Sequence, residues 1–176
     1  TALGRIAGAV SVHALDVTDA EAIEAVSREL GNESLDLLLL NAGLHLQKDC
    51  TLDALDPALW MDELRVNVIA APMVARRFVP LVARSNERRI VAMSSSLGSI
   101  AMMKTGGNYA YRAGKAALNA VMRTLAADLS GQGITVAVIA PGLTRTDMGG
   151  PNALFAVDDS VTRVRRTIAA LRPDQS

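Results

Sequence analysis

The stretch Leu35-Asp-Leu-Leu-Leu-Leu-Asn41-Ala-Gly43 decides the fold, because a run of apolar residues ends directly on an asparagine and a glycine. A continuous apolar run bounded by turn residues is typical of a strand that is covered on both faces of a parallel sheet. The segments 89–94 and 134–139 have the same character, and the second runs into Pro141-Gly142. The β-prone run Val10–Leu15 is expected to be a further buried strand.

Helical segments separate these strands. Asp16-Val-Thr-Asp19 is a cap-like start, and apolar residues then recur at helical spacing as far as Leu30. A long helix is predicted over residues 57–84, with a kink at Pro72, and another over residues 109–129. The alternation of strands and helices predicts the α/β class, with a doubly wound, Rossmann-like parallel sheet.

Composition excludes several classes of protein. Half of the 176 residues are hydrophobic, 20% are charged and the mean hydropathy is +0.24, which excludes a disordered or fibrous chain. The 18 basic and 18 acidic residues cancel, so no nucleic-acid or membrane-surface partner is expected. Cys50 is the one cysteine, so neither an internal disulfide nor a metal site is expected. We expect one partial Rossmann-like domain, 1–176, in the cytoplasm.

Polar and small residues stand at four of the predicted strand ends. They are Asp16, Asn41-Ala42-Gly43, Ser94-Ser95-Ser96 and Pro141-Gly142. Ligands of doubly wound sheets bind in the crevice beyond the carboxyl ends of the strands. These four positions therefore predict one binding crevice.

Tyr111 and Lys115 are four residues apart on a predicted helix, so the phenol and the ammonium share a face. A nearby cation favours the phenolate, so Lys115 is expected to lower the pKa of Tyr111 and suit it to acid-base work. Taken alone, such a pair is more often an ordinary surface pair. A serine cluster is likewise more often a cap or turn, and Asn67 alone is more often a tolerated polar residue of a helix.

Together, and in this order, these motifs resemble the short-chain dehydrogenase/reductase family, and most closely its C-factor and sniffer-like carbonyl reductase branch. The resemblance covers nearly the whole chain. It rests on six ordered matches, namely Asp16-Val17, Asn41-Ala-Gly43, Asn67, Ser94 to Gly98, Tyr111-x-x-x-Lys115 and Pro141 to Thr146.

The resemblance implies hydride transfer between NAD(P)H and a small-molecule carbonyl or alcohol. It implies that Tyr111 is the general acid/base and that Lys115 tunes it and holds the nicotinamide ribose. Ser95, three residues before Gly98, would bond the carbonyl oxygen, and Asn67 would carry a water-linked proton relay to the lysine. The implied cofactor-binding residues are Asp16, Val17, Asn41, Ala42, Gly43, Tyr111, Lys115, Pro141, Gly142 and Thr146.

The resemblance also implies a homo-oligomer that pairs the helices holding Asn67 and Tyr111. Apolar residues on more than one face of these helices support that expectation. Examples are Val74, Phe78 and Leu81, with Ala117, Val121 and Leu125.

The glycine fingerprint of the family, Thr-Gly-x-x-x-Gly-x-Gly, does not occur in these 176 residues. Gly4-Arg-Ile-Ala-Gly8 is a partial match that we interpret as a decoy, because no strand fits before it. We therefore expect the fold to be truncated at its N-terminus and also at its C-terminus. Two hypotheses follow, a reductase of which this sequence is a fragment, and a truncated, cofactor-free homologue with a C-factor-like signalling or interaction role.

Overall fold

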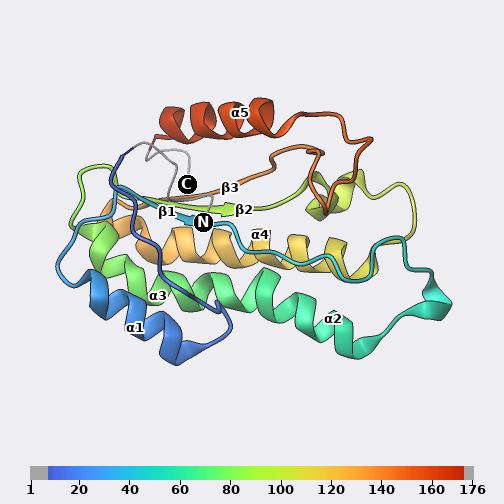
Figure 1. The fold of residues 1–176 in the computed structure, drawn as a ribbon, viewed down its shortest axis with the longest axis horizontal. Helices are drawn as coiled ribbons and strands as arrows, with labels where there is room; N and C mark the ends of the chain where they lie inside the picture. Colours follow the sequence, from blue (N-terminus) through green and yellow to red (C-terminus); the bar gives the residue numbers. More distant parts are fainter. Residues whose placement is uncertain (1–7, 173–176) are drawn as a thin grey trace.

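Three parallel strands form the sheet of this protein, shown in Figure 1 as a computed structural model that describes residues 8–172. They are β1 (Leu37–Leu40), β2 (Arg89–Met93) and β3 (Thr135–Ile139), in the order β1-β2-β3. Leu37 pairs with Arg89, which in turn pairs with Thr135. The three apolar runs predicted as parallel strands are confirmed, with β1 beginning two residues later than predicted.

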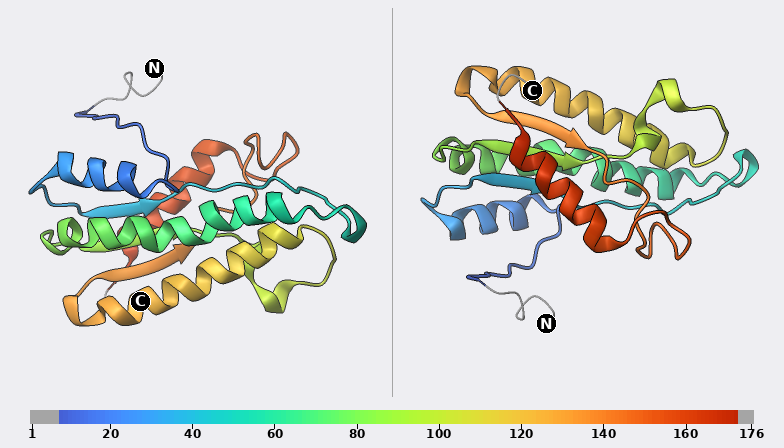
Figure 2. Two further views of the ribbon diagram at one scale, coloured as in Figure 1. Left: turned by 90° about the horizontal axis from the view of Figure 1, so that it is seen from below. Right: turned by 90° about the horizontal axis from the view of Figure 1, so that it is seen from above.

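Helices cover both faces of the sheet. One face packs against α1 (Ala20–Leu30), α3 (Ala70–Ala83) and α4 (Tyr109–Leu129), and the other packs against α5 (Val157–Ala170) (Figures 1 and 2). Side chains of β2 alternate accordingly, because Ile90 and Ala92 face α3 and α4 while Val91 faces α5. Covered faces and parallel strands confirm the doubly wound, Rossmann-like α/β class.

The segment Val10–Leu15 is not a strand, and this corrects the prediction. It runs without sheet partners, Val12 is 60% exposed, and the His13 Nδ1 atom lies 2.9 Å from the Glu29 Oε2 atom of α1. A short β-prone run becomes a strand only where a neighbouring strand offers backbone partners, and this segment lies along α1 instead. Gly8 is described, whereas positions 4–7 of the Gly4–Gly8 stretch lie outside the described residues.

The long helix predicted over residues 57–84 is confirmed as three consecutive pieces. These are α2 (Pro57–Leu64), a π-helical turn η3 (Arg65–Ile69) and α3. The irregular turn ends three residues before Pro72, which has no N–H to donate to the carbonyl one turn earlier. The predicted distortion therefore takes the form of a widened turn, and it contains Asn67.

This helix, Pro57–Ala83, is the one among residues 8–172 that is long and apolar enough to cross a membrane. Length and apolar composition are weak evidence, because a core helix of a soluble fold passes the same test. Val74, Phe78 and Val82 are buried within the chain, which is the burial of a core helix.

Aspartates begin two of the helices. Asp19 accepts hydrogen bonds from the backbone of Glu21 and Ala22 at the start of α1, and Asp56 does the same for α2. The Asp19 cap confirms the helix start predicted from the sequence. Four short 3₁₀ turns complete the described elements, η2 (Leu52–Ala54), η4 (Ser96–Gly98), η5 (Ile100–Met102) and η6 (Ser130–Gln132).

Candidate active site

Three of the four predicted positions lie at one edge of the sheet. Asn41-Ala42-Gly43 follows β1, Ser94–Ser96 follows β2, and Pro141-Gly142 follows β3. Because the strands are parallel, their carboxyl ends share this edge. Asp16, the fourth position, follows no strand, and this corrects the prediction.

Asn67 is 2% exposed and holds the segment that follows β1. Its Oδ1 atom accepts from the backbone N–H of Leu44 at 2.7 Å, and its Nδ2 atom donates to the carbonyl of Leu44 at 2.8 Å. A Cβ added at Gly43 would lie 3.3 Å from the Asn67 Oδ1 atom and 3.7 Å from the Lys115 Nζ atom. The backbone at Gly43 therefore comes close to both side chains, and a larger residue would crowd them.

Lys115 is 4% exposed, and its Nζ atom donates to the carbonyl of Met93 at 2.8 Å. Burial lowers the pKa of Lys115 to about 8, because the ammonium has lost water. The Nζ atom lies 5.6 Å from the centre of the Tyr111 ring. The predicted pair is thus brought together, one helical turn apart, at the end of β2.

Tyr111 is 9% exposed, and its phenol lies close enough to the Ser95 hydroxyl for Ser95 to affect its pKa. Burial raises the pKa of Tyr111, the Ser95 side chain lowers it, and the charge of Glu63 raises it further. The net direction is upward, which corrects the expectation that Lys115 would lower this pKa. Burial of the phenol is the largest cause of the upward shift, and the Lys115 ammonium donates to the Met93 carbonyl.

The three serines after β2 have different surroundings. Ser94 is buried, and its hydroxyl donates to the Asn119 Oδ1 atom at 2.6 Å within the fold. Ser96 is exposed. Ser95 is the serine that reaches Tyr111, and its oxygen also accepts from the backbone N–H of Leu97.

The sequence patterns did not identify two residues of this site, His45 and Glu63. The His45 ring stacks on the Tyr111 ring, with centroids 4.3 Å apart and an angle of 24° between the planes. Glu63 is fully buried and is electrostatically coupled to Tyr111. Two signals were available, since His45 lies two residues after Gly43 and Glu63 lies one helical turn before Asn67.

Gly98 offers a test of how tightly this edge is packed. A Cβ at Gly98 would lie 2.8 to 2.9 Å from the backbone and Cβ of Lys115. Gly98→Ala is therefore expected to destabilise the fold by about 1–3 kcal/mol in urea unfolding. Gly106→Ala is the matched control, because a Cβ there meets nothing within 4 Å. Equal stability of the two variants would contradict the close packing.

The loop after β3 carries three further predicted residues. Pro141 accepts from the Ser160 hydroxyl at 2.9 Å, and Gly142 has a positive φ of 81° beneath the Phe155 ring. The hydroxyl of Thr146 accepts from the backbone N–H of Gly149 at 3.2 Å. Pro141 and Gly142 follow β3 at the sheet edge, where α5 holds Pro141, and the described bonds of Thr146 lie within its own loop.

Asp16 and Val17 lie in the turn before α1. The Asp16 carboxylate accepts from the N–H and the hydroxyl of Thr18, both at 2.8 Å, and these bonds lower the pKa of Asp16. Val17 packs partly buried against the cluster that contains Ile23 and Phe78. Their described contacts are with α1 and its neighbours and not with Tyr111 or Lys115.

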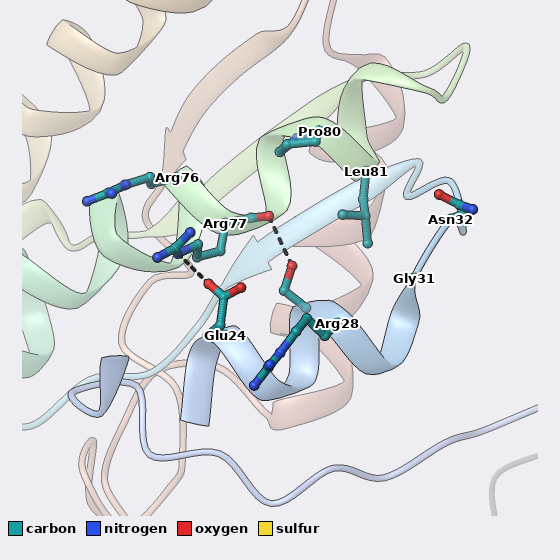
Figure 3. Close-up of a pocket in the computed structure, with 9 residues that line it drawn as sticks. Glu24, Arg28, Gly31, Asn32, Arg76, Arg77, Pro80 and Leu81 are labelled. Carbon is teal, nitrogen blue, oxygen red and sulfur yellow. Dashed lines mark hydrogen bonds and ion pairs between the residues drawn. The ribbon is translucent and has the colours of Figure 1, made fainter. Parts of the chain in front are cut away.

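A surface groove of about 400 Å³ lies away from these residues, between α1 and α3 (Figure 3). An ion pair of 2.8 Å between Arg77 and Glu24 crosses it, and the Ser27 hydroxyl donates to the Arg77 carbonyl. None of the predicted site residues lines this groove. The candidate site is therefore the edge that holds Tyr111, and not the groove.

A doubly wound parallel sheet with a buried tyrosine, a buried lysine and a half-buried serine beyond its strand ends is the arrangement that the resemblance to the short-chain dehydrogenase/reductase family implies. Comparisons with known proteins agree with it. A family model described as short chain dehydrogenase matches residues 1–154. The C-signal protein of Myxococcus xanthus is 35% identical over 142 residues, which are 81% of this chain and 85% of that protein.

Two solved structures extend the comparison. The carbonyl reductase Sniffer of D. melanogaster has a TM-score of 0.86 at 32% identity, covering 92% of this chain and 71% of that one. The NADPH-bound carbonyl reductase from chicken fatty liver has a TM-score of 0.85 at 28% identity, covering 94% and 72%. This chain belongs to the short-chain dehydrogenase/reductase family.

Proposed function

We propose that this protein reduces carbonyl compounds with NAD(P)H, with Tyr111 as the general acid. The observation that carries the proposal is the buried Tyr111 phenol, which lies near Ser95 and one helical turn from a buried Lys115. A phenol of raised pKa is protonated at neutral pH and above, so it carries the proton that the substrate oxygen takes up. The family, and the reductases among its structural neighbours, support the same chemistry.

Each site residue has a separate role in the proposed reaction. NAD(P)H, when bound, supplies the hydride that the carbonyl carbon accepts. The Ser95 hydroxyl donates a hydrogen bond to the substrate oxygen, and the Tyr111 phenol gives that oxygen its proton as the alcohol forms. Lys115, with a pKa of about 8, is mostly an ammonium at pH 7 and is a donor for a ribose hydroxyl. Asn67 holds the segment after β1 in place and links to the lysine through water.

The residues of this chain fit the nicotinamide ribose of the dinucleotide better than its pyrophosphate. Gly43 brings backbone close to Lys115 and Asn67, which suits the nicotinamide ribose. Asn41, Ala42, Pro141, Gly142 and Thr146 share that edge, and Asp16 with Val17 would contact adenine. A pyrophosphate needs a glycine loop at a helix N-terminus, and the fingerprint for one is not among these 176 residues.

The missing pyrophosphate contacts predict weak cofactor binding by the 176 residues alone. Loss of several kcal/mol of phosphate contacts weakens affinity by roughly a thousandfold or more. Titration of the purified chain should therefore show no saturable binding at millimolar NAD(P)H. A version that carries a strand–glycine loop–helix–strand segment before residue 1 should bind. Tight binding by the 176 residues would contradict this prediction.

The similarity to C-signal favours a second candidate function. In that case the chain acts as a cofactor-free signalling or interaction protein. The extended version decides between the two, because a reductase gains NAD(P)H-dependent turnover that requires Tyr111. An extended chain that binds cofactor and turns over no carbonyl substrate would favour the interaction role.

We also propose that two copies pair through the helices that hold Asn67 and Tyr111. Three of the six side chains given as examples for this interface, Val74, Phe78 and Leu81, are buried within the chain, which corrects the expectation for these three. The other three are half-buried, namely Ala117, Val121 and Leu125. Other apolar side chains of the long helix that holds Asn67 are exposed and support the pairing. They are Leu59, Met61, Ile69 and Met73.

A further inference from the structure

Glu63 of α2 is a fully buried carboxylate with an unusual set of partners. Its Oε1 atom accepts from the backbone N–H groups of Leu46, at 2.7 Å, and of Gln47, at 3.0 Å. Its Oε2 atom is buried and has no hydrogen-bond partner in the part of the chain that the structure describes. Burying an unpaired carboxylate oxygen costs free energy, so this arrangement calls for a physical reason.

Glu63 and Asn67 act on the same short segment. They are four residues apart on one continuous helix, so their side chains share a face. Asn67 holds Leu44 by two hydrogen bonds, and Glu63 holds Leu46 and Gln47 by two more. The segment between residues 44 and 47 is thus fixed at both ends by buried side chains of one helix.

His45 lies between these two anchors. Its ring stacks on Tyr111, and its Nε2 atom lies 2.9 Å from the Asn108 Oδ1 atom. Asn108 immediately precedes α4 in the left-handed conformation, with φ of 54°, and its Oδ1 atom also accepts from the backbone N–H of Asp49. The stacked ring is therefore held from the helix that carries Asn67 and from the start of the helix that carries Tyr111.

We propose that Glu63 is a positioning residue for Tyr111, which it serves by fixing His45 against the phenol ring and by placing a buried negative charge nearby. The proposal rests on the proposed function of Tyr111. An uncharged glutamine could accept the same two N–H bonds, so the loop contacts alone do not require a carboxylate. The charge has an effect on Tyr111 that the contacts do not have.

That effect concerns the protonation of the phenol. The groups that face Tyr111 are Ser95 after β2, Lys115 on its own helix, His45 after β1 and Glu63 on α2. Burial and the Glu63 charge both raise the pKa of Tyr111, so the phenol stays protonated to a higher pH. The Glu63 charge thereby extends to higher pH the range in which the phenol is in the protonated form that carbonyl reduction needs.

The first test reads the position of His45. The chain has two histidines, so a His13→Gln background leaves His45 as the one imidazole signal in proton NMR. Stacking on Tyr111 should shift that signal upfield of its position in an unfolded chain. Glu63→Leu should abolish the upfield shift, whereas Glu63→Gln, which can still accept both N–H bonds, should retain it. An unchanged shift in folded Glu63→Leu would overturn the proposal.

The second test reads the charge and does not depend on Glu63→Leu folding. The chain has two tyrosines, so a Tyr109→Phe background leaves Tyr111 as the one phenol in an absorbance titration at 295 nm. Glu63→Gln should move its midpoint to lower pH. Asp62→Asn is the matched control, because Asp62 is the exposed neighbour of Glu63 on the same helix, and it should not move the midpoint.

Equal midpoints for Glu63→Gln and the parent chain would overturn the role of the charge. Neither test measures turnover, so failure of the proposed reductase function would appear separately, as turnover that is indifferent to Tyr111→Phe. Circular dichroism on each variant confirms that the helices remain.

Discussion

Replacing Tyr111 with phenylalanine is expected to lower carbonyl reduction by a factor of about 100 to 10,000, the range that a positioned general acid contributes. The ring is buried beside His45 and Lys115, so phenylalanine keeps the packing and removes only the hydroxyl. The substrate oxygen then loses its proton donor. The rate should fall with little change in cofactor affinity.

The measurement is steady-state turnover of the extended chain with NADPH and an aldehyde or ketone. Tyr109→Phe is the matched control, because Tyr109 stands two residues earlier on the same helix and is less buried. It should retain turnover within a few fold. A Tyr111→Phe variant as active as the Tyr109→Phe control would refute the assignment of the acid.

The sequence predicted this helix and its strands well because the signals are local. The apolar runs of β1, β2 and β3 and the 21-residue helix Tyr109–Leu129 depend on continuous hydrophobicity, periodicity and flanking glycines. The edge that gathers Asn41, Ser95 and Pro141 follows from parallel strands alone. Their convergence could be expected without any tertiary contact being known.

Val10–Leu15 shows where local signals fail. Its composition suits a strand, but pairing requires a neighbour, and His13 pairs instead with Glu29 of α1. Whether a β-prone run is paired is a tertiary property. The same holds for the expected direction of the Tyr111 pKa, which depended on the ammonium of Lys115 facing the phenol rather than a carbonyl.

His45 and Glu63 were missed for a related reason. A histidine in a loop and a glutamate in a helix are usually exposed, so only their spacing from Gly43 and Asn67 indicated a place in the site. Their importance comes from burial and from contacts across 16 to 66 positions in the sequence, such as Glu63 with Gln47 and His45 with Tyr111. Only the folded chain brings these residues together.

Lys115→Met is expected to stabilise the fold at pH 7 while removing activity. The folded pKa of Lys115, about 8, lies below its ordinary value of 10.5 because the ammonium is buried. At 1.36 kcal/mol per pKa unit, this difference corresponds to roughly 3 kcal/mol by which the charged lysine destabilises the fold below pH 8. The hydrogen bond to Met93 offsets about 1 kcal/mol, so the variant should gain about 2 kcal/mol at pH 7.

The sign of this effect should change with pH. Between pH 8 and pH 10.5 the unfolded chain binds more protons at Lys115 than the folded chain, so the stability of the parent protein rises with pH across that window. Above pH 10.5 the destabilisation is gone, and the variant, which lacks the bond to Met93, should be less stable than the parent by about 1 kcal/mol.

Urea unfolding of the parent and the variant at a series of pH values from 7 to above 10.5 measures the pH at which the two proteins have equal stability. Lys104→Met is the matched control, since Lys104 is exposed and its loss should leave the pH dependence unchanged. A Lys115→Met variant that is less stable than the parent at pH 7 would contradict the claim that burial of the ammonium costs more stability than its hydrogen bond to Met93 provides. A cation kept where it destabilises the fold needs a reason outside stability, and the proposed donation to a cofactor ribose beside Tyr111 supplies one.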